Sequence, residues 1–392
     1  MYVSNKVSDL PPYLFSSFQK KKEKLLAKGV DVIDLGIGAP DLPTPKFILD
    51  KFCEEVQNPT NHRYSPYDGS AEFREAVAYF YEHHYGVKVD PNTEILTLIG
   101  SKEGIANLIQ AAINPGDTVI IPDPGYPVYK TAVHLAGGTS TYLPLDIQNG
   151  YVPMFDQVQE QVKADAKLLF LNYPGNPTAA TVELNTFMEA ITFGKQNNIA
   201  IIHDAAYDLV TFDDYKSPSI LQVPHAKEVA VEFGSLSKSF NMTGWRIGYV
   251  VGNPTLIKAL ATLKSNIDTS QFLAIQKAAA HALRSDLSEV KKHSAIFKER
   301  MERMYDGLKQ AGFEVEKPKG SIFIWPRVPA GYTSSEFAER LLEEAGVIVT
   351  PGTAFGPSGE GFIRIALSVK LERIDEVIRR LKEFICKGVI SS

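Results

Sequence analysis

A lysine with two serines and an arginine nearby is the set of residues best suited to chemistry in this chain. The run FGSLSKSFNMTGWRIGYVVG, residues 233–252, places Lys238 between two apolar, strand-like stretches. A lysine at a partly buried strand end is desolvated, which lowers the pKa of its amine and allows it to form a Schiff base with a carbonyl. Ser235, Ser237 and Arg246 add two hydroxyls and a fork-shaped cation, which suit a phosphate dianion. The simpler alternative is a surface lysine with accidental neighbours.

Three other motifs place polar residues where an apolar run ends. Asp204 closes IAIIHD, Asn176 lies in the loop NYPGNPT, and Ser101 and Lys102 follow ILTLIG in GSKEG. Residues at the carboxyl ends of parallel strands face the ligand side of a sheet, and a helix N-terminus binds anions. Taken singly, Asp204 is more often a helix cap, Asn176 a turn residue and GSKEG a plain strand–helix turn.

Together these groups fit one cofactor. A lysine for an aldehyde, a phosphate cradle and an aspartate for a pyridine nitrogen are what pyridoxal phosphate requires. Two other phosphate motifs are excluded. GIGAPD, residues 36–41, lacks the third glycine of a dinucleotide fingerprint, and Pro40 prevents an immediate helix. GSKEG lacks the Lys-Ser/Thr pair of a P-loop. We expect no metal site.

The elements that must position these residues alternate along the middle of the chain. Short apolar runs such as TVIIP, KLLFLNYP, IAIIHD, VAVEFGS and IGYVVGN are separated by stretches with helical spacing. This alternation predicts an α/β fold with a mostly parallel sheet covered by helices on both faces.

The pattern changes near residue 253. We expect a long helical stretch to about residue 309 with one break around SNIDTSQF, and then FEVEKP, SIFIWPRV, VIVTPG and GFIRIALS as strands of a small α+β domain. A last amphipathic helix is predicted over about 371–387. The predicted division is an arm of residues 1–45 that joins the small domain, a large domain of residues 46–284 and a small domain of residues 285–392.

Composition narrows the class of protein. The 392 residues are 44% hydrophobic and 22% charged, with a net charge of -5, which is ordinary for a soluble enzyme and gives no reason to expect nucleic acid or a membrane as partner. The N-terminus lacks the apolar core of a signal peptide. Cys53 and Cys386 are the two cysteines, far apart in sequence, so we expect no disulfide framework and a cytoplasmic protein.

The chain resembles the class I/II aminotransferases of fold type I, which depend on pyridoxal phosphate. The similarity covers essentially the whole chain in order, through GIGAPD, HRYSPYDG, GSKEG, DPGYPVY, NYPGNPT, DAAY, SLSKSFNMTGWRIG and FIRIAL. Within this family, LPPYLF, GSKEGIAN and DPGYPVYK are most similar to bacterial LL-diaminopimelate aminotransferases and their close relatives. The fold implied is a large domain with a mostly parallel seven-stranded sheet plus the small domain.

The resemblance implies a role for each motif residue. Lys238 would hold the cofactor and move the substrate proton, Asp204 would pair with the ring nitrogen, and Tyr207 would donate to the ring's phenolic oxygen. The remaining cofactor contacts implied are Asn176 on the phenolic oxygen, Tyr126 on the ring face, and Ser101, Lys102, Ser235, Ser237 and Arg246 around the phosphate. One departure is GNPTAA, where Gly175 and Ala179 replace the family's usual Asn and Gly. The resemblance therefore does not define the shape of this loop.

Further roles concern the substrate and a second subunit. Arg364 would bind the α-carboxylate with help from Asn176 and the amide of Gly38. A salt bridge from Arg364 to Glu360 is the structural alternative. Tyr64 would reach the phosphate of the neighbouring subunit's cofactor, which implies a homodimer with shared sites. Tyr13 and Asp268 are candidates for the far end of the substrate, where a loop without a ligand is an equal alternative.

The activity implied is ping-pong transfer of an amino group from an amino acid to a 2-oxo acid, with 2-oxoglutarate as the expected acceptor. The donor stays open among LL-diaminopimelate, aspartate, alanine, methionine and aromatic amino acids. The same cofactor also supports a C–S lyase or a decarboxylase. A transcription regulator with an aminotransferase-like domain is the alternative from another class, but no basic helix-turn-helix module precedes the pattern.

Overall fold

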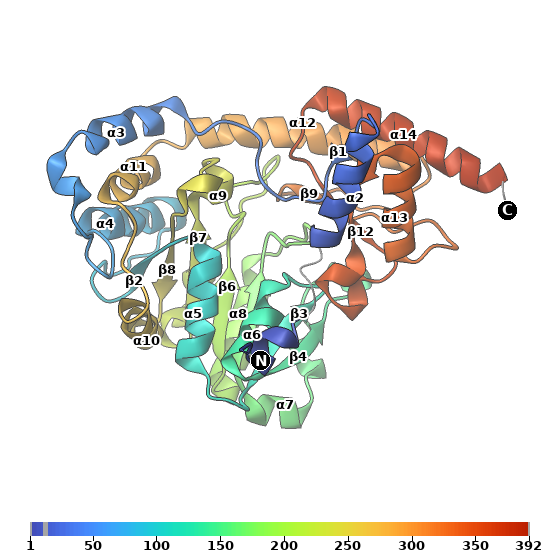
Figure 1. The fold of residues 1–392 in the computed structure, drawn as a ribbon. Helices are drawn as coiled ribbons and strands as arrows, with labels where there is room; N and C mark the ends of the chain where they lie inside the picture. The colour runs from blue at the N-terminus through green and yellow to red at the C-terminus, as the bar shows by residue number, and fades with distance from the viewer. Residues whose placement is uncertain (1, 11–14, 391–392) are drawn as a thin grey trace.

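The computed structural model describes residues 2–10 and 15–390, and a seven-stranded sheet lies at its centre (Figure 1). The spatial order is β2-β8-β7-β6-β5-β3-β4, and β8 runs antiparallel to both of its neighbours while the other pairs are parallel. The strands are β2 (Ile95–Leu98), β3 (Thr118–Asp123), β4 (Thr139–Pro144), β5 (Ala166–Asn172), β6 (Ala200–Asp204), β7 (Ala230–Ser235) and β8 (Gly248–Gly252). The predicted mostly parallel sheet of seven strands is confirmed.

Helices cover both faces of this sheet because its strands are apolar on both sides. Leu168 and Phe170 of β5 belong to one buried cluster, and Leu169 and Leu171 belong to the other. The first face is covered by α5 (Ser101–Ala112), α6 (Val128–Ala136) and α10 (Pro254–Ser265). On the second face, α4 (Ala71–Phe80) and α8 (Leu184–Asn197) pack against the strands, while α11 (Leu273–Leu283) packs on α4 and α3 (Lys46–Val56) packs on α11.

A second core lies beneath two small sheets. One pairs β1 (Ile33–Asp34) with β10 (Val347–Ile348), and the other has the order β11 (Thr350–Pro351), β12 (Ile363–Ala366), β9 (Phe323–Ile324). These strands pack with α12 (Ser288–Gln310), α13 (Ser334–Ala345) and α14 (Leu371–Ile390). α12 extends across the top of the view in Figure 1 and connects the α11 side of the molecule with this second core. The proposed boundary at residue 284 lies just before α12 and stays a prediction.

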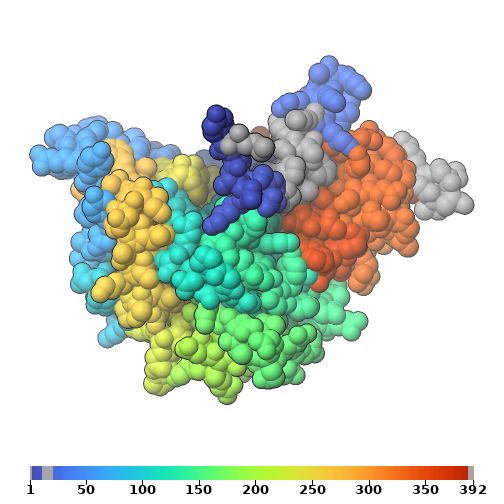
Figure 2. Space-filling view, turned by 60° about the horizontal axis from the view of Figure 1, so that its bottom comes forward, coloured from blue at the N-terminus to red at the C-terminus, as the bar shows by residue number. Residues whose placement is uncertain are grey.

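The N-terminal segment contacts both parts of the molecule. Lys6, in α1 (Asn5–Ser8), donates from Nζ to the carbonyl oxygen of Leu135 in α6 at 3.1 Å, and Figure 2 shows this segment in dark blue lying over the centre of the molecule. α2 (Phe15–Ala27) lies beside α13, where Lys21 pairs with Glu339 and with Glu343. Across the described parts of the chain, none of the helices combines the length and apolar character needed to cross a membrane.

Candidate active site

A cavity of about 430 Å³ lies at the edge of the large sheet where its parallel strands end. Asn172 and Asp204, the last residues of β5 and β6, are paired in register, as are Ser235 at the end of β7 and Gly248 at the start of β8. The lining consists of Ile37, Gly38, Ala39, Ser101, Lys102, Tyr126, Asn172, Asn176, Asp204, Ala206, Tyr207, Ser235, Ser237, Lys238, Thr243, Arg246, Phe323 and Arg364. Strand ends far apart in sequence therefore deliver their polar residues to one site, as expected for such a sheet.

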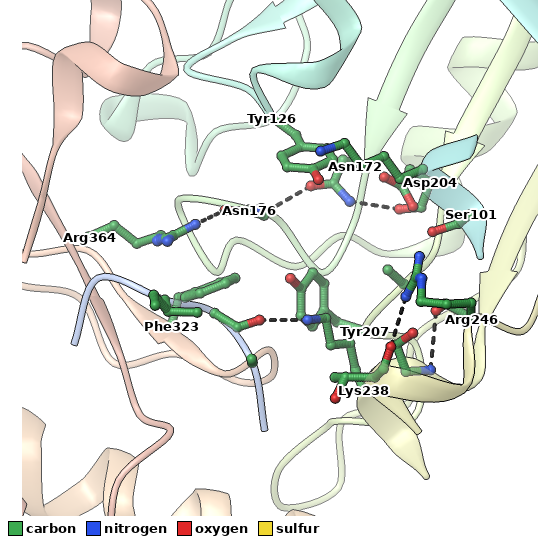
Figure 3. Close-up of a pocket in the computed structure, with 18 residues that line it drawn as sticks. Ser101, Tyr126, Asn172, Asn176, Asp204, Tyr207, Lys238, Arg246, Phe323 and Arg364 are labelled. Carbon is green, nitrogen blue, oxygen red and sulfur yellow. Dashed lines mark hydrogen bonds between the residues drawn. The ribbon is translucent and has the colours of Figure 1, made fainter. Parts of the chain in front are cut away.

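The cavity has two different ends (Figure 3). Arg364 and Phe323 lie at one end, and Ser101 and Arg246 lie at the other, with Tyr207 and Lys238 between them. The first end comes from the small sheet of β12 and β9, and the second from the start of α5 and the segment that follows α9 (Leu236–Ser239). A molecule spanning the cavity would thus meet a guanidinium at each end.

Lys238 lies on α9, and its amine reaches into the cavity. Its Nζ donates to the carbonyl oxygen of Gly38 at 2.5 Å. Burial lowers the pKa of Lys238 to about 8, and the positive charges of Arg364 and Arg246 act in the same direction. The carboxylate of Asp204 opposes the shift. An amine with this pKa is partly neutral near pH 8 and is available as a nucleophile or a base.

Asp204 is a buried carboxylate that lines the cavity. Burial raises its pKa, and the hydroxyl of Tyr129, which donates to Oδ2 at 2.8 Å, opposes the rise. Oδ1 is buried and accepts no hydrogen bond of normal geometry from the described residues. A buried carboxylate oxygen without a donor is costly, so Asp204 is suited to a ligand that brings a proton or a positive charge.

The end of the cavity around Ser101 is suited to an anion. The N-terminus of α5 begins at Ser101, and Gly100 before it has φ 80°. A Cβ atom on Gly100 would lie 2.2 Å from a terminal nitrogen of Arg246, so a larger residue at this position would displace the guanidinium. The Oγ of Ser235 accepts from the backbone N–H of Ser237 at 3.2 Å and fixes the adjacent turn. Helix N-termini, hydroxyls and a guanidinium together bind phosphate.

Arg364 is held in one orientation at the opposite end. It donates to Oδ1 of Asn176 at 2.9 Å and to the carbonyl oxygen of Gly36 at 2.6 Å. The rings of Phe323 and Phe355 lie 4.3 Å and 4.8 Å from the guanidinium carbon, as cation–π contacts require. Glu360, the structural alternative, instead accepts from the backbone N–H and the hydroxyl of Ser334.

The loop that carries Asn176 is tied to Asp204 through Asn172. The side-chain amide of Asn172 donates to the backbone oxygen of Asp204 at 2.7 Å, and its Oδ1 accepts from the backbone N–H of Asn176 at 2.7 Å. Ala179 has φ 57°, in the left-handed region that favours glycine. The loop therefore retains at Ala179 a conformation suited to the family's usual glycine.

The structure brings most of the predicted site residues to this cavity, but two of the described ones lie elsewhere. Tyr64 is 90% exposed and does not line the cavity. Asp268 also lies outside the lining, and its carboxylate accepts from Nζ of the buried Lys264 at 2.5 Å. Tyr13 lies outside the described residues. The other predicted residues, including Gly38 and Lys102, all line the cavity.

Sequence reasoning missed four residues that shape the site: Asn172, Tyr129, Phe323 and Phe355. Asn172 carried a usable signal, because it ends an apolar run as Asp204 does. Tyr129 lies in the first turn of α6, three residues after the predicted Tyr126, and the two rings pack edge to face with centroids 5.7 Å apart. The two phenylalanines gave no such signal, because apolar residues in a strand or loop predict a core.

The fold and this arrangement define a class before any relative is considered: a fold type I transferase of the kind that depends on pyridoxal phosphate. The family described as aminotransferase class I and II matches residues 30–381, and the chain belongs to this family. The resemblance found in the sequence is confirmed, and the protein is an aminotransferase.

Individual relatives agree with this assignment. The chain is 46% identical over 390 residues to an LL-diaminopimelate aminotransferase of Moorella thermoacetica, with 99% of each protein covered. Among solved structures, it is similar to substrate-bound BacF from Bacillus subtilis, with a TM-score of 0.94, 37% identity and 98% of each chain covered. A double mutant of Thermus thermophilus aspartate aminotransferase has a TM-score of 0.92 and 28% identity, with 98% of this chain and 100% of the other covered.

Proposed function

We propose that this aminotransferase binds pyridoxal phosphate in the cavity and uses Lys238 to transfer the amino group. The observation that carries the proposal is the position of the Lys238 amine between an anion-binding end and the fixed guanidinium of Arg364. The two ends suit a cofactor phosphate and a substrate carboxylate, and the amine lies where the two molecules would meet.

The residues present fit this cofactor. Asp204 has a buried oxygen that lacks a donor, which a protonated ring nitrogen would supply. Gly100 leaves space beside Arg246 in the part of the cavity suited to a phosphate. When bound, the cofactor supplies an electron sink that stabilises negative charge on the substrate Cα.

The side chains of the site then have distinct tasks. Lys238 holds the cofactor and moves the proton at the substrate Cα, for which its lowered pKa is suited. Asp204 would keep the ring nitrogen protonated, helped by the hydrogen bond from Tyr129. Tyr207 and Asn176 would donate to the phenolic oxygen, and Tyr126 would pack on the ring face. The residues that would bind the phosphate are Ser101, Lys102, Ser235, Ser237 and Arg246.

Arg364 binds the α-carboxylate of both substrates in turn. Its contacts with Asn176 and Gly36 hold the guanidinium plane in place, so two parallel hydrogen bonds to a carboxylate form without reorientation. Gly38 contributes its backbone amide. A ping-pong reaction needs only one such anchor, because the amino acid and the 2-oxo acid occupy the site at different times.

We propose LL-diaminopimelate as the amino donor and 2-oxoglutarate as the acceptor, which would give the enzyme a place in lysine biosynthesis. Support comes from the curated relatives of this name, which are 44–46% identical over nearly the full chain. Donors of the aspartate, alanine, methionine or aromatic type remain the alternative, since an aspartate aminotransferase shares the fold at lower identity.

A panel of amino donors with 2-oxoglutarate as acceptor tests this proposal. The expected result is glutamate formation that depends on both substrates, with kcat/KM for LL-diaminopimelate at least about tenfold above that for the other donors. A higher kcat/KM for aspartate or an aromatic donor would contradict the donor assignment. Release of ammonia, sulfide or carbon dioxide from an amino acid without any acceptor would favour a lyase or a decarboxylase instead.

We further propose that the protein is a cytoplasmic homodimer with shared active sites. Each subunit would consist of the predicted arm, the large domain and the small domain. The exposed tyrosine of the HRYSPYDG motif, Tyr64, supports the dimer, because a side chain that is 90% exposed is free to reach a neighbouring subunit. Both cysteines are exposed and free, which suits a reducing compartment.

A further inference from the structure

The contact between Phe355 and Arg364 depends on a loop that takes no part in lining the cavity. Phe355 ends η8 (Gly352–Phe355), and its ring lies 4.8 Å from the guanidinium carbon of Arg364. The ring also packs edge-on against Trp325, at 5.8 Å between centroids. The position of this loop therefore affects the group that anchors the substrate.

Glycines make the loop closely packed. η9 (Pro357–Gly359) folds back on η8, and a Cβ atom on Gly352 would lie only 1.8 Å from the carbonyl oxygen of Gly359. Gly356 has φ 127°, and a Cβ atom there would lie 2.1 Å from Oδ1 of Asp123. The two turns of the loop are thus in direct backbone contact, and the loop also packs directly on Asp123.

That contact comes from Asp123, the last residue of β3 in the large sheet. Its buried carboxylate accepts from the backbone N–H of Ser358 at 3.1 Å and 3.2 Å and from the hydroxyl of Ser358 at 2.8 Å. Two residues further on, the backbone N–H of Gly125 donates to the carbonyl oxygen of Phe355 at 2.8 Å. The end of β3 is thus bonded to both sides of the loop.

We propose that Asp123 is a positioning residue for substrate binding, which holds the Phe355 loop against Arg364 through Ser358. This inference rests on the proposed role of Arg364 as the carboxylate anchor. Asp123 does not line the cavity, and we expect its effect to fall on carboxylate affinity. Its position three residues before Tyr126 offers a second route, through the cofactor, and the experiment separates the two routes.

Three variants provide the test: Asp123→Ala, the milder Ser358→Ala at an exposed position, and the control Ser335→Ala. Ser335 also contacts the loop, through the hydroxyl of Thr353 at 3.3 Å, but does not touch Asp123. Titration of the cofactor-loaded enzyme with glutarate, an unreactive dicarboxylate, reports affinity at the anchor. We expect the Kd for glutarate and the KM of both substrates to rise roughly 5- to 50-fold in Asp123→Ala and about 2- to 5-fold in Ser358→Ala.

Four further readouts are expected to stay constant or to change in a defined way. The values of kcat and the Kd for pyridoxal phosphate stay within about twofold of wild type in both variants. In cofactor-free protein, exchange of the Gly125 amide is faster in Asp123→Ala and unchanged in Ser335→Ala. Ser358→Ala adds nothing in the Asp123→Ala background, as a shared contact requires.

A loss of cofactor affinity without a change in the Kd for glutarate would place the effect of Asp123 on Tyr126 and overturn the inference. Unchanged glutarate binding and unchanged Gly125 exchange in Asp123→Ala would overturn it as well. Failure of the proposed function is a separate outcome: wild-type protein would then not transaminate, or glutarate binding would not depend on Arg364.

Discussion

The surroundings of the Lys238 amine disfavour its protonated form, and this lowers the stability of the folded protein. The folded-state pKa of about 8 lies below the ordinary value of 10.5 because of burial and the two nearby arginines. The Lys238 amine therefore binds a proton more readily in the unfolded chain than in the folded protein. The free energy of unfolding rises with pH between about 8 and 10.5, and below pH 8 the folded protein carries the full cost of burying the charged amine.

Lys238→Met should stabilise the protein stripped of cofactor. We expect the free energy of unfolding at pH 7 to increase by about 1–3 kcal/mol, less what the lost hydrogen bond to Gly38 contributed. The gain should shrink as the pH rises from 8 towards 10.5. Denaturant unfolding curves of both proteins at pH 6, 7, 9 and 10 measure this gain in the free energy of unfolding. A variant that is less stable than wild type at every pH would refute the lowered pKa.

Arg364→Lys separates charge from geometry. Lysine keeps the positive charge but loses the planar fork that Asn176 and Gly36 hold in place. We expect kcat/KM for amino acids to fall roughly 10- to 1000-fold, or about 1.4–4 kcal/mol of transition-state binding. Cofactor affinity, measured by titration, should be almost unchanged. An equal loss with simple amines, or loss of bound cofactor, would show that Arg364 is a structural residue.

Much of the site could be predicted from the sequence because its polar residues follow apolar runs. Asp204 ends β6, Asn176 and Lys238 follow the ends of β5 and β7 within four residues, and a parallel sheet brings such ends together. Phe323 and Phe355 could not be found in this way. Their role depends on where β9 and the loop after β11 place them beside Arg364, which spacing within one element does not determine.

At the scale of elements, the turn from β2 into α5 brings the backbone of Gly100 close to the guanidinium of Arg246. Gly100→Ala should weaken cofactor binding, because its Cβ atom would lie 2.2 Å from Arg246. We expect the Kd for pyridoxal phosphate to rise about 10- to 100-fold, equivalent to the loss of one or two charge-assisted hydrogen bonds.

Gly312→Ala is the matched control for this prediction. Gly312 has φ 85°, close to the 80° of Gly100, but a Cβ atom there would meet nothing within 4 Å. Both variants should lose about 1–2 kcal/mol of stability from the left-handed backbone, and only Gly100→Ala should lose cofactor affinity. A similar loss of affinity in both would mean that backbone strain, and not the position of Arg246, is responsible.

Helices and strands could be predicted from the sequence where both faces of a strand are buried, and less well elsewhere. β4, TSTYLP, was missed because it is an edge strand with Thr and Ser in place of an apolar run. The helical stretch after residue 253 has a second break at residues 284–287, where Leu287 has φ 59°. FEVEKP was predicted as a strand but forms no β-ladder. Phe313 and Val315 are buried, and the backbone of Glu314 accepts only from the N–H of Arg327 among the described residues.

At the scale of the whole molecule, the proposed dimer completes the site with Tyr64. Mixing Tyr64→Phe and Lys238→Ala subunits should give hybrid dimers that have one intact site. We expect activity above that of either parent after the subunits are exchanged, because one site regains both residues. An active protein that sediments strictly as a monomer would contradict shared sites.

The overall architecture followed from the alternation of strands and helices, but the path of the N-terminal segment did not. The arm was expected to join the small domain, and Lys21 and β1 do contact it. Lys6, however, docks on α6 against the large sheet. Short polar stretches such as SNKVSD carry no periodic pattern that selects one surface over another.

Reduction with borohydride tests the central claim most directly, namely that Lys238 is the residue that holds the cofactor. Purified protein loaded with pyridoxal phosphate should be yellow, and reduction should leave the label on the peptide containing Lys238, located by mass spectrometry. Lys102, which lines the same cavity, and the buried Lys264 are the internal comparisons. A label on Lys102 or Lys264, with Lys238 unmodified, would contradict the account.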